Sequence, residues 1–267
     1  MLRHQQAGAW DEAFLDTASM PWVQKNKSER QYTQALRLAY AGKTQEALEQ
    51  AEQLPKAAQA QQLAWRLRRY RAAEQAKAPE QRYDQFRALG DFLDSQKRAQ
   101  AQQVGVVGAA WEALRAHDYW QAQELFDRVP TEEAAAGFEI ATAGRVLADA
   151  AANNKESQKL LAQTLETLRR AEAQGFDVSA VCMHDFAVEA FLDGTWKAET
   201  GEVLSVDCGA GEFVLEPRPE GTSFYFYAAG LQNTNGVLAA AWTYRAVDEI
   251  EITVNGKTLR YFRELPA

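Results

Sequence analysis

Residues 117–130 read His-Asp-Tyr-Trp-Gln-Ala-Gln-Glu-Leu-Phe-Asp-Arg-Val-Pro, and this stretch decides the fold of the first part of the chain. Apolar residues recur in it at every third or fourth position, which predicts one buried helical face: Tyr119, Ala122, Phe126 and Val129. His117 and Asp118 precede that face as a turn, and Pro130 ends the helix. So short a helix is not stable alone, so its apolar face must pack on a neighbour.

A second stretch of the same kind lies earlier in the chain. The pattern predicts a helix over residues 31–40, with Tyr32, Leu36 and Tyr40 on one face. Gly42 ends it, because the left-handed backbone after a helix costs glycine little. The next helix starts at Thr44 and places four residues on one face before Pro55: Ala47, Leu48, Ala51 and Leu54.

These stretches repeat along the chain at a regular spacing. Ala47 and Pro55 precede Ala122 and Pro130 by 75 residues. Predicted turn points follow one another at intervals of 37, 38 and 37 residues: Gly42, Pro79, His117 and Asn154. A period of this length is typical of stacked helical hairpins, none of which buries its apolar face alone.

The sequence therefore predicts four hairpins in succession. Their helices cover residues 31–40 and 44–54, 57–77 and 80–98, a helix through 111–114 and 119–129, and 131–152 and 155–174. Short helices near 9–18 and 179–192 are expected to cap the two ends.

The turn and second helix of two hairpins resemble the tetratricopeptide repeat. That family places a small residue where its helices cross, an aromatic residue one turn later and a proline after the hairpin. Ala122, Phe126 and Pro130 match these three positions, and Ala47 and Pro55 match two of them. The resemblance covers about residues 28–175 and implies an α-solenoid that binds other molecules on the inner helices of its hairpins.

The pattern changes at Asp193-Gly194, where apolar residues begin to alternate with polar ones. Expected strands cover residues 195–199, 202–208, 212–216, 222–228, 237–246, 249–254 and 257–262. Asn255-Gly256 joins the last two as a hairpin turn, and other turns are expected at 209–211, 217–221 and 232–236. We therefore expect an α+β protein, with a helical array in residues 1–193 and an antiparallel β domain in 194–267.

Gly194-Thr195-Trp196 resembles the Gly-x-Trp that opens lipocalin-like barrels, where the Trp fills the barrel floor. Some 74 residues are too few for a full lipocalin with a ligand cavity, so a small barrel or a sandwich is expected. The run from Phe224 to Tyr227 puts aromatic side chains on both faces of one strand. One face joins the core, and the other packs on the helices or contacts a ligand or partner.

Charge is distributed unevenly along the chain. The net charge is −8, but residues 56–98 carry +5 and residues 99–193 carry −8. Such a polarised surface either is simply solvated or steers a partner. Arg66, Arg68, Arg69 and Arg71 lie near Trp65 and Tyr70, but nucleic acid is an unlikely partner for so acidic a protein.

The composition of the chain bears on where in the cell the protein is expected. No run of about 18 uncharged apolar residues occurs, so no membrane span is expected. The first residues lack the apolar core of an export signal. A cytoplasmic location is expected, with a periplasmic or exported one if a signal has been removed. The chain has two cysteines, Cys182 and Cys208, which are expected as buried thiols, or as one bridge if the protein is exported.

Catalytic and metal-binding motifs are missing from the sequence. It contains no H-E-x-x-H, paired C-x-x-C, phosphate loop or nucleophile elbow, so no metal or cofactor is expected. Cys182, His184 and Asp185 are close in sequence, but on a helix Cys182 and His184 would point apart.

We therefore expect a non-enzymatic protein-binding scaffold or adaptor that captures a peptide or protein segment in the groove of the helical array. The candidate partner-binding residues are Tyr32, Tyr40, Arg66, Arg69 and Trp111. The alternative is a small-ligand or glycan-binding protein whose site in the β domain uses Trp196, Tyr225, Tyr227 and Trp242. A third hypothesis is an enzyme whose catalytic residues are far apart in sequence and come together only in the folded chain. The partner and the oligomeric state are not predicted.

Overall fold

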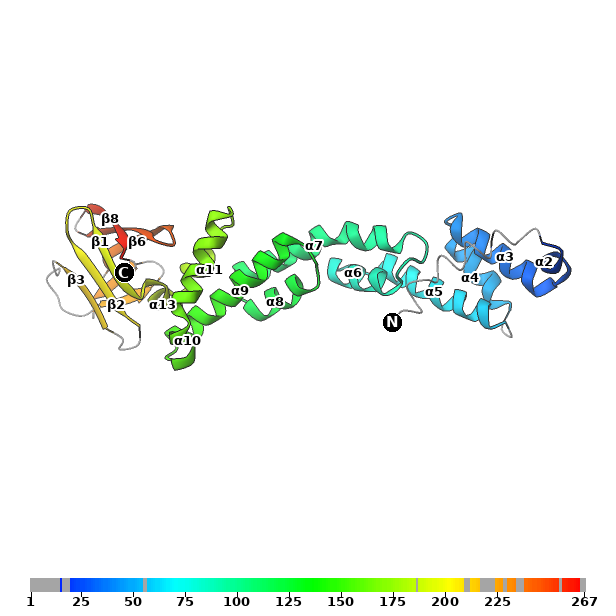
Figure 1. Ribbon diagram of the computed structural model, residues 1–267, viewed down its shortest axis with the longest axis horizontal. Helices are drawn as coiled ribbons and strands as arrows, with labels where there is room; N and C mark the ends of the chain where they lie inside the picture. The colour runs from blue at the N-terminus through cyan, green and yellow to red at the C-terminus, as the bar shows by residue number, and fades with distance from the viewer. Residues whose placement is uncertain are drawn as a thin grey trace. The chain divides into compact units, whose positions relative to one another are not determined.

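The computed structural model describes residues 15, 20–54, 57–185, 187–208, 212–216, 224–227, 230–233, 238–254 and 256–264 (Figure 1). The chain divides into two compact units, Met1–Val106 and Val107–Ala267. Helix α7, Ser95–Arg115, contains the boundary between them.

The first unit is helical. It contains α2 Pro21–Lys25, α3 Lys27–Tyr40, α4 Thr44–Glu52, α5 Ala58–Gln75 and α6 Pro79–Ala88. Each helix packs on the next in sequence, from α2 on α3 through α5 on α6. The side chain of Asn26 caps α3 by accepting from the backbone nitrogen of Ser28 at 3.0 Å. Gly42, with a φ of 79°, makes the turn after α3.

The predicted helix over residues 80–98 is wrong in its middle. α6 ends at Ala88, and Gly90 and Leu93 both have positive φ before α7 begins at Ser95. The Asp94 carboxylate accepts from Nε of Arg98 at 2.9 Å and from the Tyr70 hydroxyl. The hydrogen bond from Tyr70 ties this turn to α5. A search for helical periodicity does not detect such a bond.

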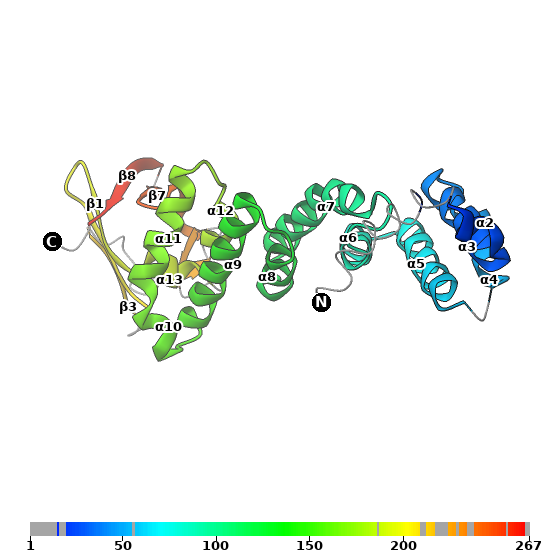
Figure 2. The same ribbon diagram turned by 45° about the vertical axis from the view of Figure 1, so that its right-hand side comes forward.

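The helices of the second unit gather around α9 (Figure 2). They are α8 Tyr119–Asp127, α9 Glu132–Ala151, α10 Lys155–Lys159, α11 Leu161–Ala173, α12 Ser179–Cys182 and α13 Val188–Leu192. α8, α10, α11, α12 and α13 all pack against α9. A Cβ on Gly137 would lie 2.3 Å from Cζ of Phe126, and one on Gly144 would lie 2.5 Å from Cε1 of Tyr119. Glycine thus allows α8 and α9 to cross closely.

The predicted succession of packed helices is confirmed. Gly42 lies between α3 and α4, Pro79 is the first residue of α6, His117 lies between α7 and α8, and Asn154 caps α10. Two predicted helices are broken: that over 155–174 breaks at Leu160, and that over 179–192 is the separate helices α12 and α13. Pro55 lies outside the described residues, as does all of the expected helix at 9–18 except Leu15.

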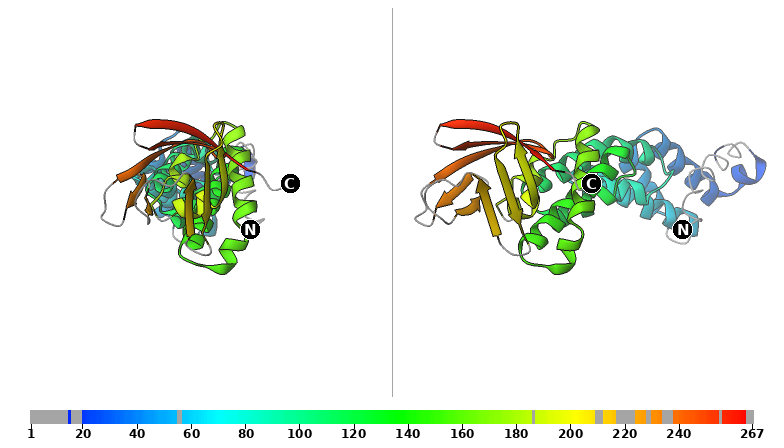
Figure 3. Two further views of the ribbon diagram at one scale, coloured as in Figure 1. Left: turned by 90° about the vertical axis from the view of Figure 1, so that its left-hand side faces the viewer. Right: turned by 60° about the vertical axis from the view of Figure 1, so that its left-hand side comes forward.

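The carboxyl-terminal part is one antiparallel sheet (Figure 3). Its strands are β1 Gly194–Ala198, β2 Val203–Asp207, β3 Glu212–Glu216, β4 Phe224–Tyr227, β5 Gly230–Asn233, β6 Leu238–Ala246, β7 Glu249–Val254 and β8 Lys257–Arg263. They lie in the order β3-β2-β1-β8-β7-β6-β5-β4. Side chains are described along five consecutive strands, β2-β1-β8-β7-β6, where Trp196, Leu204, Ile250 and Ile252 are buried.

The expectation of a barrel or a sandwich is wrong. The strands form a single sheet that is not closed into a barrel, because among the described strands β3 and β4 do not pair. Strand β5 was missed, since residues 232–236 were expected as a turn and residues 230–233 are a strand. The turns expected at 209–211 and 217–221 lie outside the described residues.

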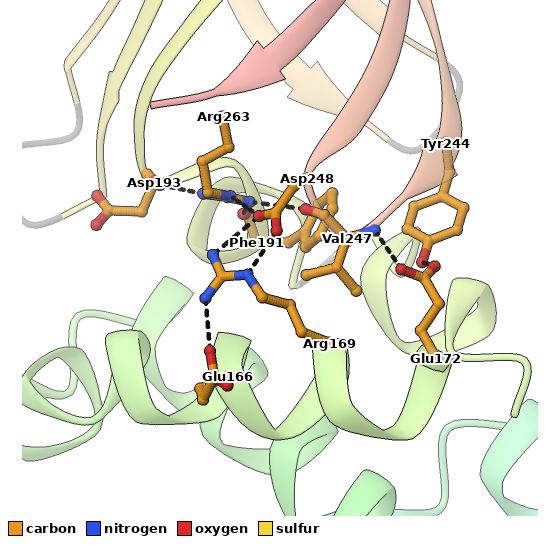
Figure 4. Close-up of polar contacts among 9 residues, drawn as sticks. All are labelled: Glu166, Arg169, Glu172, Phe191, Asp193, Tyr244, Val247, Asp248 and Arg263. Carbon is orange, nitrogen blue, oxygen red and sulfur yellow. Dashed lines mark hydrogen bonds and ion pairs between the residues drawn. The ribbon is translucent and has the colours of Figure 1, made fainter. Parts of the chain in front are cut away.

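Polar side chains join α11 to one end of the sheet (Figure 4). Arg169 donates to both carboxylate oxygens of Asp248, from Nε at 2.6 Å and from Nη2 at 2.8 Å. Glu172, one turn further along α11, accepts from the backbone nitrogen of Val247 at 3.1 Å and from the hydroxyl of Tyr244. Because two hydrogen bonds join Arg169 to Asp248, the orientation of the guanidinium against the carboxylate is fixed as well as the distance between them.

A buried arginine lies behind this junction. Arg263 is 9% exposed and donates to the backbone oxygens of Asp193 and Phe191, each at 2.6 Å (Figure 4). Its Nε lies 3.3 Å from the Asp248 carboxylate, and its guanidinium lies 4.0 Å from the ring centroid of Trp196. Burial lowers the pKa of Arg263 to about 10. The guanidinium therefore holds the chain before β1 against the last strand.

Candidate functional site

Two hollows adjoin on the helices of the second unit. One, of about 360 Å³, lies between α9 and α11. The other, of about 600 Å³, lies where α8 leads into α9. Phe138 and Glu139 line both. We call the combined surface the α9 groove; its lining residues come from segments 126–135, 138–146 and 160–170.

The floor of the α9 groove is apolar and open to solvent. Phe138 is 38% exposed and Leu160 is 44% exposed. Phe138, Thr142 and Val146 are four residues apart and share one side of α9. That side is distinct from the side of Gly137 and Gly144, which meets α8. The groove therefore exposes part of a helix face between α8 and α11.

Acidic side chains border this apolar floor. Asp127 and Glu132 line the hollow beside α8, and neither makes an ion pair with the described residues. Glu139 is bound by Nη2 of Arg170 at 2.6 Å. Both partners of that pair are more than half exposed, so it contributes little to stability. The groove combines an apolar centre with negative charge that is left unpaired.

An exposed tryptophan lies on α8. Trp120 is 70% exposed, and the guanidinium of Arg145 lies 4.3 Å from its ring centroid. Gln123 donates to the hydroxyl of Thr142, a groove residue, at 2.6 Å. Trp120 lines neither hollow, and the sequence pattern did not single it out because it lies off the buried stripe.

The predicted partner-binding residues are spread over both units. Tyr32 is buried in the core and Tyr40 is half-buried. Arg66 lies 4.6 Å over the ring of Phe92, and Arg69 lies 4.7 Å over the ring of Trp65 on the surface of α5.

Trp111, the last of these residues, belongs to the second unit. Its ring stacks on Phe176 and meets Phe126 edge-on, with centroids 5.9 Å and 5.1 Å away, and its Nε1 donates to Glu133 at 3.0 Å. Trp111 and Tyr32 therefore act mainly in packing, and neither lines the α9 groove.

The alternative ligand site in the sheet gains no support from the described side chains. Trp196 is fully buried and donates from Nε1 to the backbone oxygen of Leu192 at 2.8 Å. Trp242 is 5% exposed, with its ring centroid 6.2 Å from that of Phe191. The side chains of Tyr225 and Tyr227 lie outside the described part of the chain. The two tryptophans are core residues, which a sequence cannot distinguish from ligand-stacking ones.

The two thiols are buried, and two of the imidazoles stack on each other. Cys182 and Cys208 are buried free thiols, as expected, and burial raises the pKa of Cys182 well above its usual range. His184 stacks on His117, with ring centroids 3.8 Å apart. Among the described residues, no three acidic, histidine or cysteine side chains are placed to hold a metal ion.

Comparison of the chain with models of known protein families, with curated proteins and with solved structures finds no match. None of the helices in the described ranges is both long enough and apolar enough to cross a membrane.

Proposed function

We propose that the protein is a non-enzymatic binding protein that holds a peptide segment of a partner protein in the α9 groove. The observation that carries this proposal is the pair of adjoining hollows around Phe138, which has an apolar floor and unpaired acids at its edge. Exposed apolar patches with a polar border are typical of protein interaction sites.

The chemistry of the groove selects one kind of occupant. An apolar side chain of the partner would cover Phe138 and Leu160, and basic side chains beside it would face Asp127 and Glu132. Opposite charge accelerates encounter and excludes acidic competitors. The occupant is therefore a segment with a large apolar residue flanked by lysine or arginine.

The tetratricopeptide-like assignment is part of this proposal. It is supported by Ala122 and Phe126, which are buried where α8 crosses α9, and by turns at the expected spacing. Gly194-Thr195-Trp196 resembles the lipocalin-like Gly-x-Trp in sequence only, since the described sheet that it opens is not closed into a barrel. Both are resemblances of pattern, and the binding proposal depends on neither.

Selection from a random linear peptide library displayed against the full chain tests the proposal. Enriched peptides are expected to carry an apolar residue flanked by basic ones and to bind in fluorescence anisotropy. Phe138→Ala should weaken their binding about 30-fold, or about 2 kcal/mol, because it removes the centre of the groove floor.

Phe262→Ala is the matched control, since Phe262 on β8 has the same 38% exposure as Phe138. It should leave peptide affinity unchanged, and both variants should keep the wild-type thermal unfolding temperature within a few degrees. Failure to enrich any peptide, or equal binding by both variants, would contradict the proposal.

A further inference from the structure

A second surface with complementary chemistry lies on α5 in the first unit. Trp65 is 44% exposed, and the Arg69 guanidinium covers its ring at 4.7 Å. Arg68 is exposed as well and binds Glu52 at 2.6 Å. Residues three and four positions apart share a helix face, so these side chains form one patch. We call Trp65, Arg68 and Arg69 the α5 patch.

The α5 patch has the chemistry that the α9 groove requires of its occupant. It presents one large apolar ring with two guanidinium groups beside it. Arg69 makes no ion pair with the described residues, and segment 56–98 carries a net charge of +5. Tryptophan and arginine are the residues that most often dominate binding energy at protein interfaces.

We propose that the α5 patch of one copy of the chain occupies the α9 groove of a second copy. This inference rests on the proposed function of the groove and names its occupant. Trp65 covers Phe138, and the guanidinium groups of Arg68 and Arg69 face the carboxylates of Asp127 and Glu132. The apolar centre of the patch covers the apolar centre of the groove, and the positive edge of the patch faces the negative edge of the groove.

The two surfaces differ, so the contact is heterologous. Every bound copy keeps one unused patch or one unused groove, and assembly continues unless the rotation between copies closes a ring. Both surfaces are exposed and charged, so the association is weak and sensitive to salt.

Sedimentation velocity of the full chain tests the inference. At about 50 mM salt the weight-average sedimentation coefficient should rise with protein concentration, and at about 500 mM salt, where exposed charges are screened, the rise should largely disappear. A coefficient that stays at the monomer value over the whole concentration range at low salt overturns the inference.

Charge-reversal variants identify the surfaces. Arg68→Glu with Arg69→Glu, or Asp127→Arg with Glu132→Arg, should each weaken self-association about tenfold or more. Mixing the two variants should restore it, because one supplies an intact patch and the other an intact groove. A chain with all four substitutions should also associate, since its charges are exchanged. Variants that associate as the wild type does, or a mixture that does not, overturn the inference.

Matched controls change the same charge elsewhere. Lys77→Glu with Lys97→Glu and Glu112→Arg with Asp207→Arg alter exposed residues outside both surfaces and should leave self-association intact. Circular dichroism checks that every variant is folded. If selected peptides bind the groove through Phe138 while the wild type stays monomeric, this inference is overturned and the proposed function stands. Failure of both assays overturns both.

Discussion

At the scale of single residues, the stacked pair of His117 and His184 responds most directly to pH. Their planes are inclined by 26°, and Tyr119 lies edge-on to both. Burial lowers the pKa of each imidazole, and His117 lowers that of His184 further, while Asp185 opposes the shift. Nδ1 of His117 and the hydroxyl of Tyr119 are buried and make no hydrogen bond with the described residues. The pair is therefore suited to two neutral rings.

Acidification should destabilise the second unit through this pair. In the unfolded chain these histidines bind protons near pH 6.5, whereas in the folded chain their lowered pKa values delay protonation to a lower pH. The stabilisation is therefore fully present above pH 6.5 and decreases as the pH falls below it. His117→Asn should reduce this loss, because asparagine tolerates the φ of 62° at this position and does not titrate. Thermal unfolding between about pH 8 and about pH 5 measures the difference.

The prediction needs a reference protein, because the wild-type curve alone contains the response of the whole chain to pH. Tyr119 contacts both imidazoles and Asp185 acts on both electrostatically, and the variant retains these two residues. The prediction concerns the difference between wild type and His117→Asn at each pH. Parallel curves for the two proteins would show that the stacked pair does not control acid stability.

At the scale of secondary-structure elements, the crossing of α8 and α9 depends on two glycines. Gly137→Ala or Gly144→Ala would push a methyl group into the ring of Phe126 or Tyr119. Each substitution should destabilise the second unit by about 1–3 kcal/mol because the core is overpacked. Chemical denaturation with urea measures the change.

Gly108 on α7 provides the control for that experiment. It is exposed, it lies in a helix, and a Cβ there would meet nothing within 4 Å. Gly108→Ala should stabilise the helix by up to about 1 kcal/mol, the ordinary gain in helix propensity. Equal effects at Gly108 and Gly144 would mean that the crossing tolerates a methyl group.

Elements were predictable where one local signal decides them. Helical periodicity with Gly42, Pro79 and Asn154 located the hairpin turns, and strict alternation located β7. The break at 89–94 was missed because the bond between Tyr70 and Asp94 spans 24 residues. The groove could not be read from the sequence either, because periodicity predicts only a helix over residues 131–152 and packing alone decides which side of it stays exposed.

At the scale of the molecule, one carboxylate at the junction of α11 with the sheet contacts two arginines. Asp248 binds Arg169 and lies beside buried Arg263, so Asp248→Ala removes the carboxylate that faces Arg263, while Arg169 keeps its pair with Glu166. The loss should be about 3 kcal/mol of unfolding free energy. Lys159→Ala, which breaks an exposed pair with Glu156, should cost less than about 1 kcal/mol.

Hydrogen exchange distinguishes a local effect from a global one. If the junction couples the helices to the sheet, Asp248→Ala should accelerate exchange in α11 and in β6–β8 together. Faster exchange confined to the turn at residues 247–248 would show that the helices and the sheet are stabilised independently.

The burial of both cysteines has a practical consequence for labelling. The sequence contains no thiol other than Cys182 and Cys208, and neither side chain is accessible in the folded chain. A maleimide dye should therefore leave the native protein unmodified, and one cysteine introduced on the surface would become its sole attachment point. A fluorophore could then be placed beside the α9 groove without first removing any natural residue.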